Sequence, residues 1–353
     1  MTTLREVALL RLVAQRLVGP RAVDATDAVR WLTAAQAQDL RGALTSIALR
    51  SAAGTRAGVE AALRTGAVVR SWPMRGTLHL VAAEDLRWLL ALTTPRLLAG
   101  AARRQAELSI DAALLDRSRQ LAQESLTGGL RLRRDELYAL WQRGGVATDG
   151  QRGYHLLWQL AQTGSVCFGP IGDGEQLIVL LDEWVPTSRH LEREEALGEL
   201  ARRYFCSHGP ATVKDFSRWT GLVAVDVRTG ITLARPHLES LAVDGVEYLM
   251  DPRTPELLAG CRHHARGVLL LPGFDELVLG YSDRRATVPA EFADRIVPGG
   301  NGVFRPTVVS DGQVVGTWKH TGRSTKRTLS ATPFSSFPGK LAETIEQVYA
   351  ALP

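Results

Sequence analysis

The chain has 353 residues, of which 45% are hydrophobic and 22% are charged, an ordinary composition for a globular protein of two or three domains. Its formal net charge is +5, and all but four of its 42 basic residues are arginines, whose guanidinium groups match phosphate oxygens. The sequence has no signal-peptide pattern, and no apolar run reaches the ~18 residues of a membrane span. We therefore expect a cytoplasmic protein without a membrane partner.

The cysteines and histidines argue against a metal site. Cys167, Cys206 and Cys261 are odd in number, widely separated and never in Cys-x-x-Cys spacing. They are typical of small buried residues in a reducing compartment. The eight histidines form no ligand pattern such as His-Glu-x-x-His. We expect no metal and no other cofactor.

The first hundred residues are predicted to form helices followed by a pair of strands. The predicted helices are Leu4–Leu17, Ala25–Ala34, Arg41–Arg50 and Arg56–Arg64, and the predicted strands are Val68–Trp72 and Thr77–Val81. Asp24 or Thr26 can cap the second helix, and Thr55 can cap the fourth. This order, with Arg75 in the turn between the strands, is typical of a winged helix-turn-helix.

The same order recurs twice along the chain. The second round is predicted as helices Arg134–Arg143 and Tyr154–Thr163 with ribbon strands Ser165–Pro170 and Gln176–Leu181. The third is predicted as helices Glu194–Phe205, Thr212–Trp219 and Ile231–Leu241 with a ribbon over Val243–Met250. Three rounds in register predict tandem winged helices over residues 1–105, 106–190 and 191–265.

After Gly267 the composition favours β structure. Short strands are predicted over Val268–Leu271, Leu277–Leu279, Phe304–Val309 and Gln313–Trp318, and a closing helix over Leu341–Leu352. Asp311-Gly312 between two apolar runs is a strong hairpin signal. We assign residues 266–353 to a β-rich, half-barrel domain. The predicted fold class is therefore α+β, with three tandem winged helices and this domain.

Winged helices usually bind duplex DNA, with a helix in one groove and the wing against the backbone. The candidate phosphate ligands are Arg75 and His79 on the first ribbon, Lys214 and Arg218 on a helix of the third round, and Lys319, His320, Arg323, Lys326 and Arg327 in the basic segment Gly316–Leu329. The alternative is that the basic segment is only a solubilising hairpin. Phosphate contact and plain exposure are equally compatible with Lys214 and Arg218.

Several motifs together carry a family resemblance. They are Gln36–Asp39, Arg70–Leu80, Leu271–Tyr281, Asn301–Val309 and Gly316–Lys319. Along nearly the whole chain they resemble the AlkZ/YcaQ family, bacterial DNA glycosylases with tandem winged helices. The family's catalytic signature is Gln, an apolar residue, and then Gln or Asp, which Gln36-Ala37-Gln38 matches in the two-glutamine form. The resemblance implies excision of N7-alkylated guanines, including bulky natural-product adducts and interstrand crosslinks.

The pair Gln36 and Gln38 makes a structural demand. Residues two apart diverge by about 200° on an α-helix, so the two amides can converge only if residues 35–39 are extended or at a helix end. An N7-alkylated guanine already carries positive charge and leaves as a neutral base, so no general acid is needed. Two amides can then orient a water and favour the developing sugar cation through fixed dipoles.

Bulky or crosslinked adducts are difficult to flip into a pocket, as most glycosylases do with their base. By analogy we expect an open channel and a probing hairpin. The candidates are the β pair over Asn301–Gln313, with Asn301, Phe304 and Arg305 as its probing residues, and the basic segment that follows it. The sequence leaves two biological roles for the protein open: general DNA repair, or self-resistance to a DNA-alkylating natural product.

The predicted function is a monofunctional DNA glycosylase that acts as a monomer on duplex DNA and associates with the nucleoid when bound. No lysine stands beside the glutamine motif for Schiff-base chemistry, so strand cleavage is not expected. The alternative is a non-enzymatic winged-helix protein, either a transcriptional regulator or a binder of adducts. Two further interpretations are open. Asp39 can be a helix cap or a residue of the site. Asp275-Glu276 can be an acid pair for hydrolysis, or Asp275 can be a helix cap; capping is favoured for both aspartates.

Overall fold

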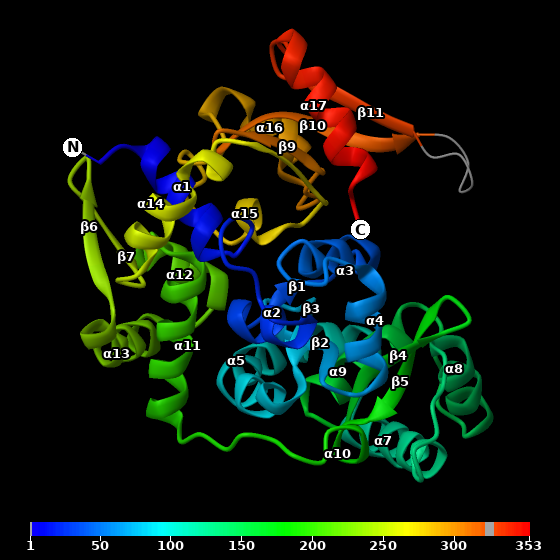
Figure 1. Cartoon of the computed structure of the whole chain (residues 1–353). Coiled ribbons are helices and arrows are strands. Elements are labelled where there is room, and N and C mark those ends of the chain that lie inside the picture. Colours follow the sequence, from blue (N-terminus) through cyan, green and yellow to red (C-terminus); the bar gives the residue numbers. More distant parts are fainter. Residues whose placement is uncertain (1, 322–327) are drawn as a thin grey trace. The chain divides into compact units, whose positions relative to one another are not determined.

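The computed structural model describes residues 2–321 and 328–353 and contains two compact units (Figure 1). One unit comprises Met1–Val59 and Leu197–Pro353, and the other comprises Glu60–Ala196. Helices α4 (Arg56–Arg64) and α11 (Arg193–His208) cross the two boundaries between them. Among the described residues, none of the helices combines the length and apolar character that crossing a bilayer requires.

The unit Glu60–Ala196 is a four-stranded antiparallel sheet covered by helices. Its elements are β2 (Val68–Met74), β3 (Thr77–Ala82), α5 (Leu86–Gly100), α6 (Ala102–Glu107), α7 (Ala112–Leu126), α8 (Arg134–Arg143), α9 (Arg152–Gln162), β4 (Val166–Gly172), β5 (Glu175–Leu180) and α10 (Leu181–Trp184). The strand order is β3-β2-β4-β5, and Arg70 of β2 lies opposite Leu80 on one side and Phe168 on the other. Trp72 and Trp141 are buried in its hydrophobic core.

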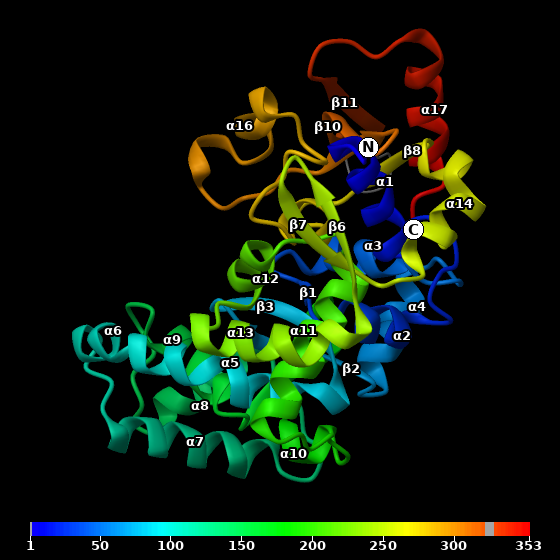
Figure 2. The same ribbon diagram turned by 90° about the vertical axis from the view of Figure 1, so that its left-hand side faces the viewer.

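The other unit carries the glutamine motif and the C-terminal sheet. Its elements are α1 (Leu4–Ala14), α2 (Ala25–Leu32), β1 (Ala35–Gln36), α3 (Leu40–Ala48), α12 (Val213–Thr220), α13 (Ala224–Ala234), β6 (Glu239–Val243), β7 (Val246–Met250), α14 (Thr254–Ala265), β8 (Val268–Leu271), α15 (Glu276–Leu279), α16 (Ala293–Ile296), β9 (Thr307–Ser310), β10 (Gln313–Thr321), β11 (Thr328–Pro333) and α17 (Gly339–Ala350). Helices α1 and α14 pack side by side in two views (Figures 1 and 2).

The C-terminal sheet has the strand order β11-β10-β9-β8 and is antiparallel throughout. Successive residues of β8 and β9 point to opposite faces, as a pleated strand requires. Leu270 and Val308 face α17, which lies along the sheet in Figure 1, whereas Leu271 and Val309 join the core that contains α1. The predicted β-rich C-terminal region is therefore present, as an open four-stranded sheet with a helix on one face.

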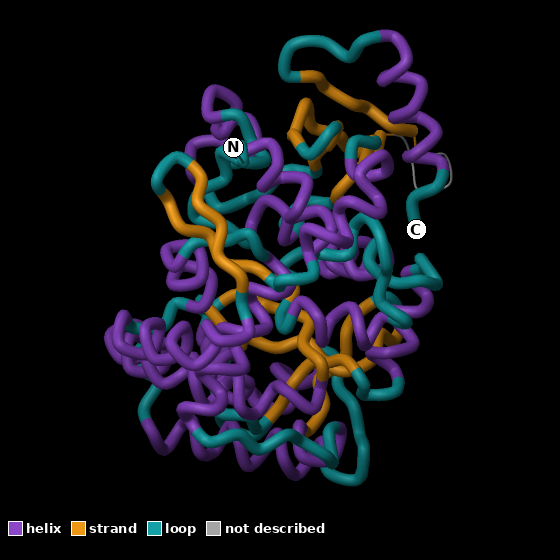
Figure 3. Tube along the Cα trace, turned by 60° about the vertical axis from the view of Figure 1, so that its left-hand side comes forward, coloured by secondary structure: helices purple, strands orange, loops and turns teal. Residues whose placement is uncertain are grey.

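The order of helices followed by a ribbon occurs as predicted in the second and third rounds. Helices α7, α8 and α9 precede the β4–β5 ribbon, and α11, α12 and α13 precede the β6–β7 ribbon, which is drawn with the other strands in orange in Figure 3. Each tip is an Asp-Gly pair with positive φ at both residues, as at Asp244 (49°) and Gly245 (77°). Asp311 and Gly312 (50° and 77°) close the β9–β10 hairpin in the same way. Such turns match the twist of the strands they join.

Three predicted elements are wrong in type or extent. Leu277–Leu279 belongs to the helical turn α15 and is not a strand, because Asp275 caps that turn. The helix predicted over Ile231–Leu241 ends at Ala234, and strand β6 already begins at Glu239. The strand predicted over Phe304–Val309 begins only at Thr307, after Pro306, which has no N–H to donate. The segment that contains Asn301, Phe304 and Arg305 is consequently a loop before the hairpin.

Candidate active site and nucleic-acid interface

The backbone of the glutamine motif is not helical. Helix α2 ends where Thr33 takes a φ of 69°, which a β-branched residue adopts only at a cost of about 1–3 kcal/mol. Ala35 and Gln36 then form the short strand β1, and α3 begins at Leu40. The prediction that residues 35–39 are not the middle of a helix is confirmed. Gln36 is 9% exposed, Ala37 is buried and Gln38 is exposed.

The side chain of Glu276 is hydrogen-bonded to the backbone of this motif. Its side chain is only 1% exposed, and its Oε1 accepts a hydrogen bond from the N–H of Gln36 at 2.9 Å. Its Oε2 accepts from Nε1 of Trp219 at 3.0 Å and lies 3.4 Å from Nε2 of His208. Both oxygens of a buried carboxylate therefore have donors, one of them on the candidate catalytic segment.

The neighbouring carboxylate, Asp275, has different partners. It forms a bidentate pair with Arg50, with Nη2–Oδ1 and Nη1–Oδ2 distances of 2.8 and 2.9 Å, and both side chains are buried. Its Oδ2 also accepts from Ser46 of α3, and its Oδ1 accepts from the N–H of Leu277. Asp275 thus caps α15, as predicted, and it also ties α15 to α3 through residues 46 and 50.

Asp275 and Glu276 do not form an acid pair for hydrolysis. Both are buried, and each is hydrogen-bonded to fixed groups of the scaffold. A general acid or base must reach its substrate within hydrogen-bond distance. We therefore assign both side chains to the support of the site, and the acid-pair interpretation is wrong.

His208 lies between Glu276 and a ring of aromatic side chains. Its ring stacks on Tyr204 at 4.8 Å between centroids, and Nδ1 is 2.8 Å from Oγ of Ser207. Burial lowers the pKa of His208 below its usual range, opposed by the carboxylate of Glu276. Gly280 permits the close packing here, because a Cβ at that position would lie 2.8 Å from the imidazole.

Asp39 occupies the N-cap position of α3 but forms no side-chain capping bond, so the capping interpretation is wrong in that respect. Its carboxylate is folded over Gly42, where a Cβ would meet Oδ2 at 2.7 Å and the carbonyl oxygen of Gly273 at 3.3 Å. Gly42 therefore allows the start of α3 to approach the loop before α15. Asp39 itself is exposed beside Gln38.

The predicted phosphate ligands of the first ribbon divide into one surface residue and one buried residue. Arg75 lies in the turn between β2 and β3 with a φ of 54° and is partly exposed. Its guanidinium donates to Nε2 of His79 at 3.2 Å, and Nδ1 of His79 is 2.8 Å from the carbonyl oxygen of Thr77. His79 is fully buried, which contradicts a direct phosphate contact and assigns it to orienting Arg75.

Lys214 and Arg218 lie one turn apart on α12 and are both exposed, so they share a face of this helix. Arg218 also lines a cavity of about 380 Å³ together with Arg284 and Phe304. The guanidinium of Arg284 lies 4.9 Å from the centre of the Phe304 ring. The structure thus brings Phe304, predicted for the probing hairpin, close to one of the predicted basic residues of α12.

The remaining predicted contacts are spread over the C-terminal region. Asn301 and Arg305 are exposed in the loop before β9, and Lys319 and His320 are exposed at the end of β10. His320 is 2.8 Å from the hydroxyl of Tyr349, so it also packs against α17. The predicted ligands Arg323, Lys326 and Arg327 lie outside the described residues.

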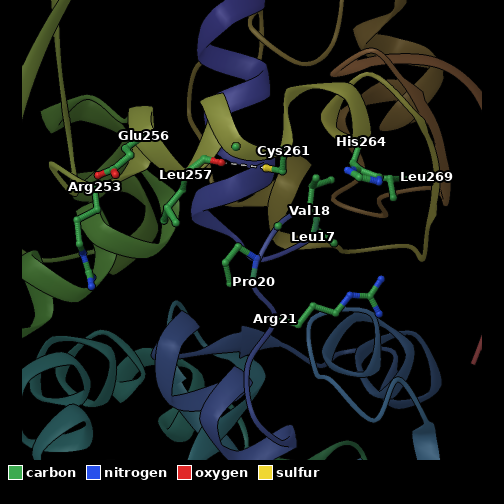
Figure 4. A pocket seen from close by; sticks show the side chains of 12 residues that line it. Leu17, Val18, Pro20, Arg21, Arg253, Glu256, Leu257, Cys261, His264 and Leu269 are labelled. Carbon is green, nitrogen blue, oxygen red and sulfur yellow. Dashed lines mark hydrogen bonds between the residues drawn. The ribbon is translucent and has the colours of Figure 1, made fainter.

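A larger cavity, of about 900 Å³, lies in the same unit between the end of α1 and α14 (Figure 4). Leu17, Val18 and Cys261 line its middle, while Arg253 and His264 lie toward opposite ends. The thiol of Cys261 donates to the carbonyl oxygen of Leu257. Neither glutamine of the motif lines this cavity, so it is separate from the candidate active site. The three cysteines are all free thiols.

Sequence reasoning missed how the site is supported. Leu271–Tyr281 carried part of the resemblance, but nothing in its pattern indicated that Glu276 reaches residue 36. Arg11 offered a signal, since it lies on the apolar stripe of the first helix. In the structure it is buried, donates to the carbonyl oxygen of Pro210 and stacks over the ring of Tyr281. A charged residue on an apolar helix face indicates a buried polar network.

The comparisons with known proteins agree on one class. The fold is that of Streptomyces sahachiroi DNA glycosylase AlkZ, which matches 99% of this chain and 96% of its own with a TM-score of 0.80 at 24% identity. A curated relative from the same organism, named interstrand DNA cross-link repair glycosylase, is 27% identical over 94% of this chain and 90% of its own. The family described as DNA glycosylase AlkZ-like matches residues 29–352. The chain belongs to this family, and it is a DNA glycosylase.

Proposed function

We propose that this enzyme hydrolyses the N-glycosidic bond of N7-alkylated guanine in duplex DNA, with Gln36 and Gln38 as its catalytic residues. The observation that carries the proposal is the extended backbone at Ala35–Gln36, which follows a sharp turn at Thr33. Gln38 lies two residues on, in the bend before α3, so neither glutamine is fixed by helix geometry and the two amides can face one sugar. A mid-helix position would have separated them.

The chemistry of the substrate explains why neutral amides suffice. Alkylation at N7 gives the guanine a positive charge, so the bond breaks to release a neutral base without protonation by the enzyme. The sugar then develops oxocarbenium character, and a water must be aimed at it. The carbonyl oxygens of Gln36 and Gln38 can accept from that water and lie with their dipoles toward the cation. Because the base leaves without being protonated, the site needs no general acid, and amides, which do not titrate, are sufficient.

The binding of DNA is proposed to use the tandem helix–ribbon units as winged helices, with the boundaries 1–105, 106–190, 191–265 and 266–353. The exposed cations Lys214, Arg218 and Lys319 and the partly exposed Arg75 support phosphate contacts on several of these units. The loop with Asn301, Phe304 and Arg305 is proposed to probe the lesion. We propose that the enzyme acts as a monomer in the cytoplasm, where it associates with the nucleoid.

The range of substrates is proposed to include interstrand crosslinks. The support is the curated relative named for crosslink repair, which matches nearly the full length of both chains. No lysine precedes Lys214 in the sequence, so none lies beside the motif in the chain to form a Schiff base with the sugar. The product is therefore proposed to be an intact strand with an abasic site.

One experiment tests the proposal directly. Duplex DNA methylated at guanine N7 is incubated with the protein, and free 7-methylguanine is measured by chromatography with mass detection. We expect release by the wild-type protein and at least ~10²-fold slower release by Gln36→Ala. The strand should remain uncut until it is treated with alkali. Binding of the methylated duplex without any base release would leave a non-enzymatic adduct binder and overturn the proposal.

A further inference from the structure

We propose that Glu276 is a positioning residue for the reaction, which acts through the backbone N–H of Gln36. This inference rests on the proposed role of Gln36. It also assigns a task to a buried carboxylate that the hydrolysis itself does not use. Glu276 lies 240 positions from Gln36 in the sequence, and their hydrogen bond connects α15 to the catalytic segment.

The bond fixes the peptide group from which the Gln36 side chain projects. The N–H of Gln36 lies at 2.9 Å from Oε1, and the side chains at both ends are at least nine-tenths buried. A hydrogen bond to an ionised acceptor is shorter and stronger than one between neutral groups. Without this acceptor, the buried N–H of Gln36 would lose its partner at a substantial cost. The segment would then shift to find another.

Two further side chains contact the carboxylate of Glu276 on its other oxygen. Trp219 of α12 donates to Oε2 at 3.0 Å, and His208 of α11 lies 3.4 Å from the same oxygen. Glu276 thus has one oxygen for the scaffold and one for the motif. The division allows a test that compares loss of both oxygens with loss of one partner of Oε2 alone.

The test compares three variants with the wild-type enzyme. Glu276→Met removes both oxygens at similar length, and Glu276→Gln can retain one amide oxygen for the N–H of Gln36. Trp219→Phe removes one partner of Oε2 and leaves His208 beside that oxygen. Single-turnover excision of 7-methylguanine is measured at saturating enzyme, and the Kd for the same duplex is measured separately. Thermal unfolding shows the temperature at which every variant is folded.

We expect excision to fall ~10²-fold in Glu276→Met, as a small misplacement of a catalytic group does. Glu276→Gln should recover most of that loss and stay within ~10-fold of the wild-type rate. Trp219→Phe should lower the unfolding temperature but excise at nearly the wild-type rate. The Kd for DNA should stay within about twofold in all three, because Glu276 touches no surface. A wild-type excision rate in folded Glu276→Met would overturn the inference.

Hydrogen–deuterium exchange resolved to the Gln36 amide separates this inference from the proposed function. The amide should be protected in the wild-type protein, Glu276→Gln and Trp219→Phe, and it should exchange much faster in Glu276→Met. If no variant releases 7-methylguanine, the proposed function fails, while this exchange pattern still decides whether Glu276 holds the segment. Unchanged protection in Glu276→Met would reject the positioning role on its own.

Discussion

The motif Gln36-Ala37-Gln38 and the segment Leu271–Tyr281 lie against each other, but they differ in the kind of polar group they use. The motif carries two neutral amides, that of Gln36 buried and that of Gln38 exposed, on a short non-helical segment. The later segment buries its two carboxylates and gives each a set of fixed donors. The two buried carboxylates therefore support the site, and the side chains of the two glutamines do not titrate.

This division fits a reaction whose leaving group is already charged. A buried charge is tolerated only when it is paired and hydrogen-bonded, and removing one partner leaves the other uncompensated. An exposed neutral amide such as that of Gln38 can be replaced with little effect on folding. Substitutions at the Arg50–Asp275 pair should consequently lower stability first, whereas substitutions of the two glutamines should lower excision first.

The largest effect is expected for Arg50→Met. It would leave Asp275 as an unpaired buried carboxylate and remove the donor to Gln15, at a cost of about 3–5 kcal/mol in the free energy of unfolding. Urea unfolding measures this change. The control is Arg262→Met, because the Arg262–Glu6 pair is also bidentate but its arginine is 40% exposed. It should cost at most ~1 kcal/mol. Equal losses would show that the buried pair has no special weight.

The next effect is on catalysis and not on folding. Gln36→Ala and Gln38→Ala should each lower the single-turnover excision rate by ~10² or more, while the Kd for the damaged duplex stays nearly unchanged. The urea midpoint should also stay nearly unchanged in Gln38→Ala, because that side chain is exposed. Gln347→Ala, at an exposed glutamine of α17, serves as the control and should excise normally. If both motif variants retain wild-type rates, the catalytic assignment is wrong and the motif belongs with the scaffold.

A smaller effect is expected from the exposed cations of α12. Lys214→Ala and Arg218→Ala should each weaken DNA binding severalfold, because each would remove one phosphate contact. The slope of log K against log salt should fall by about 0.9 for each. Lys340→Ala on α17 is the control, since Lys340 is exposed but is not a proposed DNA ligand. An unchanged salt slope in the two α12 variants would show that Lys214 and Arg218 are exposed side chains without a phosphate contact.

Local signals in the sequence predicted much of the fold, and contacts distant in sequence account for what they missed. Asp24 caps its helix as expected, and the Asp-Gly turns close their ribbons, because these features depend on a few adjacent residues. Three apolar residues fit a strand or a helical turn equally, so the cap formed by Asp275 determines that Leu277–Leu279 is helical. The extended form of the glutamine motif followed from what its chemistry requires. Its support by Glu276 depends on tertiary packing that no local pattern encodes.

The smallest effect concerns pH and again distinguishes the scaffold from the motif. Burial holds the pKa of His208 below its unfolded value near 6.5; Glu276 opposes this, and the cations Arg50 and Arg11 add to it. As the pH falls below about 6.5, the unfolded chain takes up a proton that the folded His208 does not, so the folded state loses stability until the lowered pKa is reached. His208→Gln removes this contribution and keeps a donor for Glu276. The unfolding temperature should therefore fall less between pH 7.5 and 5.5 in His208→Gln than in the wild-type protein. An equal fall in both proteins would show that His208 titrates alike in the folded and unfolded states. Its burial beside Glu276 would then not lower its pKa.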